Sequence, residues 1–357
     1  MADFHQKPFD EGTLTKLDIF ELYTREWLPV FLARESPYWN EIHLFDFFCG
    51  PGEDQNGKPG SPFRILNVLK ECHERNLDGW SKVKITVHFF DASPKKVASL
   101  KQKIECIEKL PTGIQFDFKA LPFKEAIDTY QGILSASNSA KLLFIDQCGI
   151  DEVNADVFRS LVSFPHADFL FFISSSTFNR FREHPNIKQK IVRPDDYYHV
   201  HRAVVDFYRD LIPRSQQYFL APFAIKKKMN IYGLIFGTGH PLGLDKFLKV
   251  AWEKDKLNGE ADYDINRENV SADELLLGLD ELRPSKLKAF ERELASLIEG
   301  GHCRNENDAI RVCFEHGVTP KHSEVVLNRL KQEGKIRLDF RVPNIKNRKN
   351  PRDITLT

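Results

Sequence analysis

The chain has 357 residues, more than one hydrophobic core usually organises, so we expect one large domain and one smaller domain. Its 51 basic and 51 acidic residues cancel, which excludes attraction of the whole molecule to nucleic acid and leaves such contact to a local patch. No window approaches the roughly 18 uncharged apolar residues of a membrane span, and the N-terminus lacks the apolar core of a signal peptide. We therefore expect a cytoplasmic protein without a membrane segment.

The first half of the chain alternates strand-like and helix-like segments. Residues 13–34 carry apolar side chains at spacings of three and four, which predicts an amphipathic helix within an N-terminal segment, 1–40, packed on the core. Four apolar runs with strand character follow, at 42–48, 84–90, 142–145 and 169–173. Helix-like stretches lie at 62–75, 94–109, 124–135 and 153–162. This alternation predicts right-handed βαβ crossovers and a doubly wound, mostly parallel α/β domain over 41–274.

Two further β-rich runs, at 218–225 and 231–236, flank Lys226, Lys227 and Lys228. We expect these runs to form an antiparallel hairpin that closes the sheet. A solvated turn explains the three lysines most simply, and their functional interpretation is a phosphate contact in substrate binding.

From about residue 275 the pattern changes to short helices, at 284–300 and 306–316, and Thr319-Pro320 starts a third. A short strand follows at 335–342. This order predicts a winged-helix domain over 275–345, whose third helix presents His322 and Arg329 to nucleic acid or a partner. The last residues, 346–357, form a basic tail that we expect to be mobile.

The strongest local signal is Phe45-Asp46-Phe47-Phe48-Cys49-Gly50-Pro51-Gly52, in which an apolar strand runs into a Gly-Pro-Gly turn. Glycine lets the backbone approach a ligand closely, and the Asp46 carboxylate can accept a hydrogen bond from that ligand. An ordinary β-turn would have a similar sequence. The segment therefore indicates a cofactor loop only in combination with other signals.

Two other strands also end in a carboxylate. Asp91 follows the run 84–90, where an acid can accept both ribose hydroxyls of a nucleoside cofactor, although it could also cap the helix beginning at Pro94. Asp146, followed by Gln147, ends the run 142–145, where open α/β sheets hold substrate beside cofactor. Three strand-end acids together favour a cofactor crevice.

These motifs resemble those of class I S-adenosylmethionine-dependent methyltransferases, in the variant where Phe48 replaces the first glycine. The resemblance implies that S-adenosylmethionine is held by Asp46, Phe48, Gly50, Gly52, Asp91 and Asp117. Within that set Asp91 would bind the ribose and Asp117 the adenine. Asp146 and Gln147 would take the catalytic position on the substrate side.

More narrowly, Asp46–Gly52 with 57–62, and the segment Phe144-Ile145-Asp146-Gln147-Cys148-Gly149, resemble the three-Cys-motif partner proteins, and the likeness extends through 248–254 to 327–336. This bacterial family implies a methyltransferase fold with a winged-helix end. It also implies a partner, a three-Cys-motif protein that resembles radical S-adenosylmethionine enzymes.

The sequence departs from amine-methylating nucleic-acid enzymes, which carry an aromatic residue after the fourth strand, because here Gln147-Cys148-Gly149 follow Asp146. Three functions stay open. The chain is a methyltransferase acting on nucleic acid, a noncatalytic partner that keeps the fold, or, least favoured, a nuclease with Asp46, Asp91 and Asp146 around Mg²⁺. A nucleophilic Cys148 is disfavoured because cytosine-C5 enzymes have proline where Gln147 stands.

The six cysteines are scattered, without a C-x-x-C pair, and predict reduced thiols rather than a disulfide framework. Potential zinc ligands gather at His302, Cys303, Cys313 and His316, but their spacing matches no standard site. We therefore predict no metal site.

Overall fold

The computed structural model describes residues 8–146, 153–173, 200–227, 230–254, 263–264 and 286–357. The chain divides into two compact units, Met1–Gly243 and Leu244–Thr357. The domain boundary predicted between residues 274 and 275 lies outside the described residues. None of the helices within the described ranges has both the length and the apolar character required to cross a membrane.

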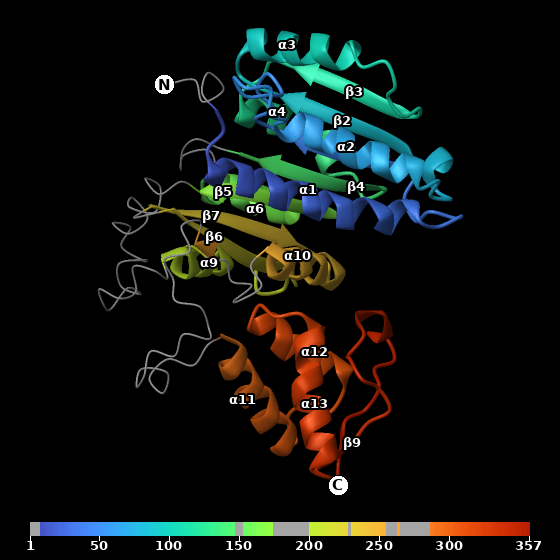
Figure 1. The fold of residues 1–357 in the computed structure, drawn as a ribbon, viewed down its shortest axis with the longest axis vertical. Helices are drawn as coiled ribbons and strands as arrows, with labels where there is room; N and C mark the ends of the chain where they lie inside the picture. Colours follow the sequence, from blue (N-terminus) through green and yellow to red (C-terminus); the bar gives the residue numbers. More distant parts are fainter. Residues whose placement is uncertain (1–7, 147–152, 174–199, 228–229, 255–262, 265–285) are drawn as a thin grey trace. The chain divides into compact units, whose positions relative to one another are not determined.

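One mixed sheet organises the first unit, with seven strands in the order β3-β2-β1-β4-β5-β7-β6 (Figure 1). The strands are β1 (Glu41–Asp46), β2 (Lys84–Phe90), β3 (Ile114–Lys119), β4 (Ser139–Ile145), β5 (Ala167–Ile173), β6 (Phe219–Lys227) and β7 (Asn230–Thr238). The first five pair in parallel, whereas β7 runs antiparallel to both β5 and β6. The predicted mostly parallel α/β sheet and its closing hairpin are confirmed.

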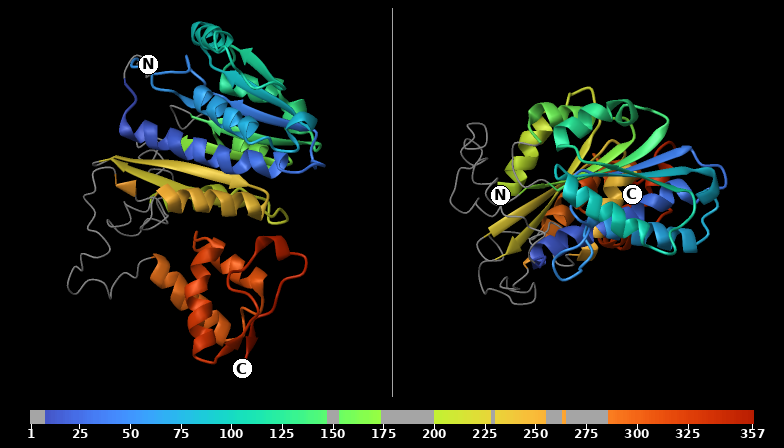
Figure 2. Two further views of the ribbon diagram at one scale, coloured as in Figure 1. Left: turned by 45° about the vertical axis from the view of Figure 1, so that its right-hand side comes forward. Right: turned by 90° about the horizontal axis from the view of Figure 1, so that it is seen from above.

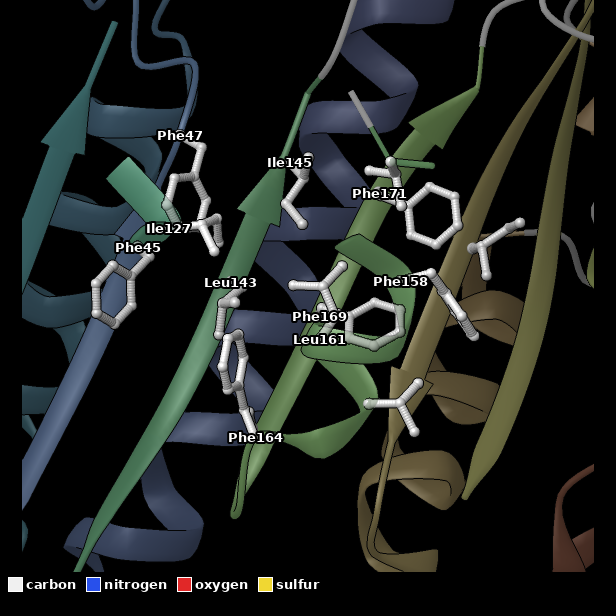
Figure 3. Close-up of a cluster of buried hydrophobic side chains, with 14 of the residues drawn as sticks. Phe45, Phe47, Ile127, Leu143, Ile145, Phe158, Leu161, Phe164, Phe169 and Phe171 are labelled. Atoms are coloured by element: carbon white, nitrogen blue, oxygen red, sulfur yellow. The ribbon is translucent and has the colours of Figure 1, made fainter. Parts of the chain in front are cut away.

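Helices cover both faces of this sheet (Figures 1 and 2). They are α1 (Glu11–Leu32), α2 (Ser61–Glu74), α3 (Pro94–Glu105), α4 (Phe123–Thr129), α5 (Gln131–Leu134), α6 (Ala155–Ser163) and α9 (Val200–Asp210). The close-up in Figure 3 shows α1 behind β4 and β5 and α6 in front of them. Parallel strands covered on both faces lose contact with water on both, which explains their continuous apolar sequences.

The core between the sheet and α6 is rich in phenylalanine (Figure 3). Phe45, Leu143 and Phe169 come from three neighbouring strands, and Phe158 and Leu161 come from α6; all are buried. On the opposite face, α1 packs as the sequence predicts. Phe20 of α1 stacks on Phe144 of β4, with ring centroids 3.9 Å apart.

The second unit is mainly helical. Its elements are α10 (Pro241–Lys254), which spans the boundary between the units, β8 (Tyr263–Asp264), α11 (Lys286–Glu299), α12 (Glu306–Glu315), η4 (Pro320–His322), α13 (Ser323–Gln332), β9 (Ile336–Arg337), η5 (Ile345–Asn347) and β10 (Thr355–Leu356). Strands β9 and β10 pair antiparallel. The three helices and a strand after them follow the predicted order, but β10 lies in the segment predicted to be a tail. The winged-helix classification stays a prediction.

The basic tail is packed against the second unit, so the expectation of a mobile tail is wrong. The buried carboxylate of Glu306, in α12, accepts hydrogen bonds from Asn344 N (2.9 Å), Asn347 Nδ2 (2.9 Å) and Arg352 Nη2 (2.6 Å). Burial alone would raise the pKa of Glu306, but Arg352 and the other donors lower it to about 2. Ile354 is buried as well. Composition could not reveal this, because the partner of the tail lies about 40 residues earlier in the chain.

Candidate cofactor and substrate site

Three carboxylates lie at one edge of the parallel sheet. Asp46 is the last residue of β1, and Asp91 and Asp146 directly follow β2 and β4. Strand β1 lies between the other two, and Asp46 is level with Phe89 of β2 and Phe144 of β4. Because the chain turns outward in opposite directions from β1 and β4, the strand order reverses here, which is where open α/β sheets bind ligands. We call these three residues the acid edge.

The loop after β1 is held by the two neighbouring strands. The amide of Phe47 donates to the carbonyl of Phe144 at 3.1 Å, and the amide of Cys49 donates to the carbonyl of Phe90 at 2.9 Å. The loop therefore continues the sheet hydrogen bonding on both sides before it turns away. The predicted cofactor loop is thus fixed directly above the acid edge.

The two glycines of this loop adopt left-handed backbone conformations, with φ of 57° at Gly50 and 89° at Gly52. A Cβ atom at Gly52 would lie 2.5 Å from the ring of Phe63 in α2 and 2.8 Å from Leu100 in α3. Close packing of two helices therefore requires glycine at Gly52, independently of any ligand.

Asp46 is completely buried, and burial raises its pKa from 3.8 to about 7. The Ser61 hydroxyl and the Phe48 amide, which donates to Oδ1 at 3.2 Å, lower the pKa, whereas the other two acids of the edge raise it. The second oxygen, Oδ2, has no hydrogen-bond partner among the described residues. Phe48 itself is partly exposed and lies 5.7 Å from the ring of Phe123. The site thus contains a buried acceptor without a hydrogen bond from the described residues.

Asp91 is partly exposed at the end of β2. Its Oδ1 accepts a hydrogen bond of 2.8 Å from the amide of Ser93, at the start of α3. This contact is a turn that precedes the helix, because the N-cap residue of α3 is Ser93 and no side chain caps the helix, so the alternative that Asp91 caps the helix is not realised. The turn uses one oxygen and leaves the carboxylate at the same edge as Asp46.

Asp117 belongs to an internal polar network. Its Oδ2 accepts hydrogen bonds from Tyr130 and, at 3.0 Å, from the Nδ1 position of His88, which is level with it on β2. The hydrogen bond with His88 is the main cause that lowers the pKa of Asp117. His88 in turn lies 3.1 Å from the Nδ1 atom of His43 on β1. These contacts were missed by sequence reasoning, although a histidine and an acid on successive strands were a visible signal.

Asp146 forms an ion pair with Lys16 of α1, a residue that sequence reasoning did not select. The Lys16 side chain is 6% exposed and that of Asp146 is 25% exposed. The ammonium of Lys16 also lies 4.6 Å from the ring centroid of Phe172 on β5. A signal existed, because Lys16 shares the helical spacing of the buried Phe20 and Tyr23 and is a lysine on an otherwise apolar stripe.

The remaining predicted substrate residues are dispersed. Gln147 and Lys228 lie outside the described residues. The backbones of Lys226 and Lys227 end β6, whose direction brings them to the same edge of the sheet as Asp146. Their side chains are outside the description, and the phosphate contact stays a prediction.

His322 and Arg329 belong to the second unit. His322 accepts a hydrogen bond of 3.1 Å from the Thr319 amide, and its ring lies 4.3 Å from that of Trp252, so it has a structural task. Arg329 is exposed on α13, with Nε 4.0 Å from Glu333. Nucleic-acid contact by these residues stays a prediction.

Within the described ranges, no group of three or more His, Cys, Asp and Glu side chains is arranged to hold a metal ion. The acid edge therefore does not provide the carboxylate cluster that the nuclease hypothesis needs. Cys303 and Cys313 are buried, and burial raises the pKa of Cys303 to about 12, while His316 lies 2.8 Å from Glu293. The two cysteines are therefore buried structural residues, whereas His302 is exposed and His316 is partly exposed.

The strand order is typical of class I methyltransferases. No protein-family model matches the sequence, and a search among curated proteins finds no related sequence. Among solved structures, a candidate class I S-adenosylmethionine-dependent methyltransferase of Listeria monocytogenes is similar, with 8% identity, coverage of 67% of this chain and 62% of that chain, and a TM-score of 0.31. A candidate methyltransferase of Escherichia coli, yhhF, shares 10% identity over 60% of this chain and 84% of that chain, with a TM-score of 0.25. A possible exported protein of Bordetella parapertussis shares 9% identity over 61% of this chain and 66% of that chain, with a TM-score of 0.32. At identities of 8–10% and TM-scores of 0.25–0.32, these matches carry no inference about this protein.

Proposed function

We propose that this protein binds S-adenosylmethionine at the acid edge and methylates nucleic acid together with a three-Cys-motif partner. The observation that carries the proposal is the buried Oδ2 of Asp46, which lacks a partner among the described residues beneath a glycine loop at the switch point of the sheet. A buried carboxylate oxygen without a hydrogen bond is costly. A ligand that donates a hydrogen bond there would remove this cost.

The residues of the edge fit the chemical groups of the cofactor. The free oxygen of Asp46 would accept a hydrogen bond from a donor of the amino-acid part, and Asp91 would accept the ribose hydroxyls. The left-handed Gly50 allows the loop to approach without a Cβ atom in the way. Asp117 has two partners already, so we assign it a role in supporting β2 and β3 rather than an adenine contact. When bound, S-adenosylmethionine would supply an electrophilic methyl group.

Asp146 is the residue that we place on the substrate side, where a carboxylate can orient a nucleophile or take its proton. Charge distribution supports a nucleic-acid substrate. Residues 320–357 contain ten Lys and Arg but only four Asp and Glu, although the whole chain is neutral. Two of the ten, Lys335 and Arg352, pair with Glu299 and Glu306 outside this segment, which leaves eight. A winged-helix role for the second unit would place this local excess on the phosphate backbone.

The first experiment is calorimetry with S-adenosylmethionine and S-adenosylhomocysteine. We expect micromolar affinity and a loss of roughly tenfold or more in Asp91→Ala, because a charged hydrogen-bond partner contributes about 1.5–3 kcal/mol. Absence of heat with both compounds, or equal affinity in the variant, would refute the cofactor assignment.

The second experiment measures tritiated methyl transfer to total RNA and DNA, with and without the three-Cys-motif protein. Asp146→Ala should abolish transfer while cofactor affinity changes by less than about threefold, which is under 1 kcal/mol. Because this change leaves Lys16 buried without its partner, Lys16→Met/Asp146→Ala is the control for misfolding. Transfer that persists in a folded variant would place the catalytic centre elsewhere.

A noncatalytic partner role is the second candidate, and one observation favours it. Asp146 forms an ion pair with a buried lysine, so in the free protein its carboxylate can contact a methyl-accepting substrate only after this ion pair is broken. Tight cofactor binding with no transfer under either condition of the second experiment would support this role.

A further inference from the structure

The ammonium group of Lys16 is held by two different kinds of cation-binding surface at the edge of the sheet. It forms an ion pair with the carboxylate of Asp146, and it lies 4.6 Å from the centroid of the Phe172 ring. A carboxylate and an aromatic face together are a common means of binding an amino group. The ammonium group of Lys16 therefore makes the two contacts that the amino group of a ligand would make.

The two surfaces belong to neighbouring strands, whereas the lysine comes from elsewhere. Ile145 of β4 is paired with Phe171 of β5, so the next residues along these strands, Asp146 and Phe172, are adjacent at the carboxyl edge. Both remain partly exposed. Lys16 reaches them from α1, 130 positions earlier in the chain. The sheet therefore builds the binding surface, and the added helix supplies only its occupant.

We propose that Asp146 and Phe172 form a subsite for an amino group and that Lys16 fills this subsite in the free protein. An incoming ammonium group would replace the Lys16 ammonium charge for charge, so that Asp146 is not left as an uncompensated partly buried anion. An uncharged hydroxyl group of equal size would not compensate the charge of Asp146.

The inference rests on the proposed function in one respect, the identification of this amino group with the methyl acceptor. Amine-methylating nucleic-acid enzymes carry an aromatic residue after the fourth strand, and this sequence has none after Asp146. The ring of Phe172, from the neighbouring strand β5, lies beside Asp146 and would take that place. The group that fits is an alkylammonium, because the exocyclic amine of a base offers an N–H donor but no charge and would leave Asp146 uncompensated. A base amine is therefore an outcome of the test below rather than the proposed occupant.

Lys16→Ala removes the occupant and keeps both surfaces. We expect n-butylammonium to raise the thermal midpoint of this variant, whereas n-butanol leaves it unchanged. In Lys16→Ala/Asp146→Asn the apparent affinity for n-butylammonium should fall by roughly tenfold or more, because the charged acceptor is gone. Adenosine and inosine, which differ in the amino group, form the second pair of probes, and an effect of adenosine is assigned to the subsite only if Lys16→Ala/Asp146→Asn abolishes it, because a nucleoside could also bind the proposed cofactor site. Stabilisation by n-butylammonium alone would support the subsite for an ammonium group. Asp146-dependent stabilisation by adenosine alone would contradict the charge requirement and indicate a base amine.

Lys141 provides a matched control, since it is also a buried lysine, but its Nζ donates, among the described residues, to the carbonyl oxygens of Ala136, Ser139 and Pro165 and to no carboxylate. In ¹⁵N-lysine-labelled unmodified protein, both ammonium groups should give protected NMR signals, assigned with Lys16→Met and Lys141→Met. Excess amine probe should broaden or shift the Lys16 signal and leave the Lys141 signal in place. This measurement remains decisive if Lys16→Ala does not fold.

Neither measurement requires S-adenosylmethionine. If an amine probe stabilises Lys16→Ala or displaces Lys16 from Asp146 while S-adenosylmethionine does not bind, the proposed function is refuted and the amino-group subsite stands. If S-adenosylmethionine binds but the Lys16 NMR signal does not change, and neither amine probe stabilises Lys16→Ala up to about 100 mM, the subsite is overturned and the cofactor assignment stands. That concentration is far above the millimolar range of weak ligands.

Discussion

Replacing Asp46 with asparagine tests whether this buried acid destabilises the free protein. Burial raises its pKa from 3.8 to about 7, so the folded state binds a proton more tightly than the unfolded chain. The favourable contribution is therefore fully present below pH 3.8 and is lost as the pH rises through about 7. At pH 8 the folded protein must hold a buried carboxylate whose Oδ2 has no hydrogen-bond partner among the described residues.

The size of the effect follows from the pKa difference. About three pKa steps at 1.36 kcal/mol each give about 4 kcal/mol between pH 4 and pH 8. Asparagine does not titrate, so Asp46→Asn should gain about that much relative to the unmodified protein over this interval. At any one pH the absolute difference is smaller, because the new amide group is itself buried and costs about 1–3 kcal/mol without a partner. The pH-dependence is therefore the diagnostic quantity.

Urea unfolding followed by tryptophan fluorescence measures this, since three of the four tryptophans, Trp27, Trp39 and Trp80, lie in the first unit. Asp168, whose pKa burial raises to about 6, titrates in both proteins and cancels in the difference. Asp91→Asn, at a partly exposed position, removes another carboxylate of the same edge and is the control for the loss of one negative charge. Parallel stability curves for Asp46→Asn and unmodified protein from pH 4 to 8 would refute the reasoning. The same variant should bind S-adenosylmethionine roughly tenfold less tightly or worse.

Three further outcomes are expected. Gly52→Ala should lower the thermal midpoint clearly more than Gly57→Ala, since both have positive φ but a Cβ atom at Gly57 meets nothing within 4 Å; equal shifts would contradict the packing argument. Glu306→Gln should destabilise the second unit at pH 7 by about 3 kcal/mol and speed tryptic cleavage of the tail, because it removes the charge that Arg352 pairs with. In the unmodified protein, the stability that the ionised Glu306 contributes should be lost as the pH falls from 4.5 through about 2. A protein ending at residue 274 should keep its cofactor affinity within about threefold by calorimetry, because the acid edge lies in the first unit; an unfolded circular dichroism spectrum would show that the units depend on each other.

The sequence alone was sufficient to predict the α/β sheet and the position of the acid edge. Strands covered on both faces exclude water from both, so β1, β2, β4 and β5 appear as continuous apolar runs that local reading detects. Each acid ends or directly follows one of the strands β1, β2 and β4, and parallel strands that alternate with helices must bring their carboxyl ends to one edge. The order of strands and helices along the chain therefore predicted that Asp46, Asp91 and Asp146, about 50 positions apart, lie at the same edge of the sheet.

Tertiary structure alone decided what those acids contact. Lys16 reaches Asp146 across 130 residues, and Tyr130 and His88 take the carboxylate of Asp117. Asp46 loses contact with water only after two neighbouring strands and the helices have packed around it. Periodicity reports which face of an element is buried, but it carries no information about which distant side chain lies opposite, because that depends on how separately formed elements pack against one another.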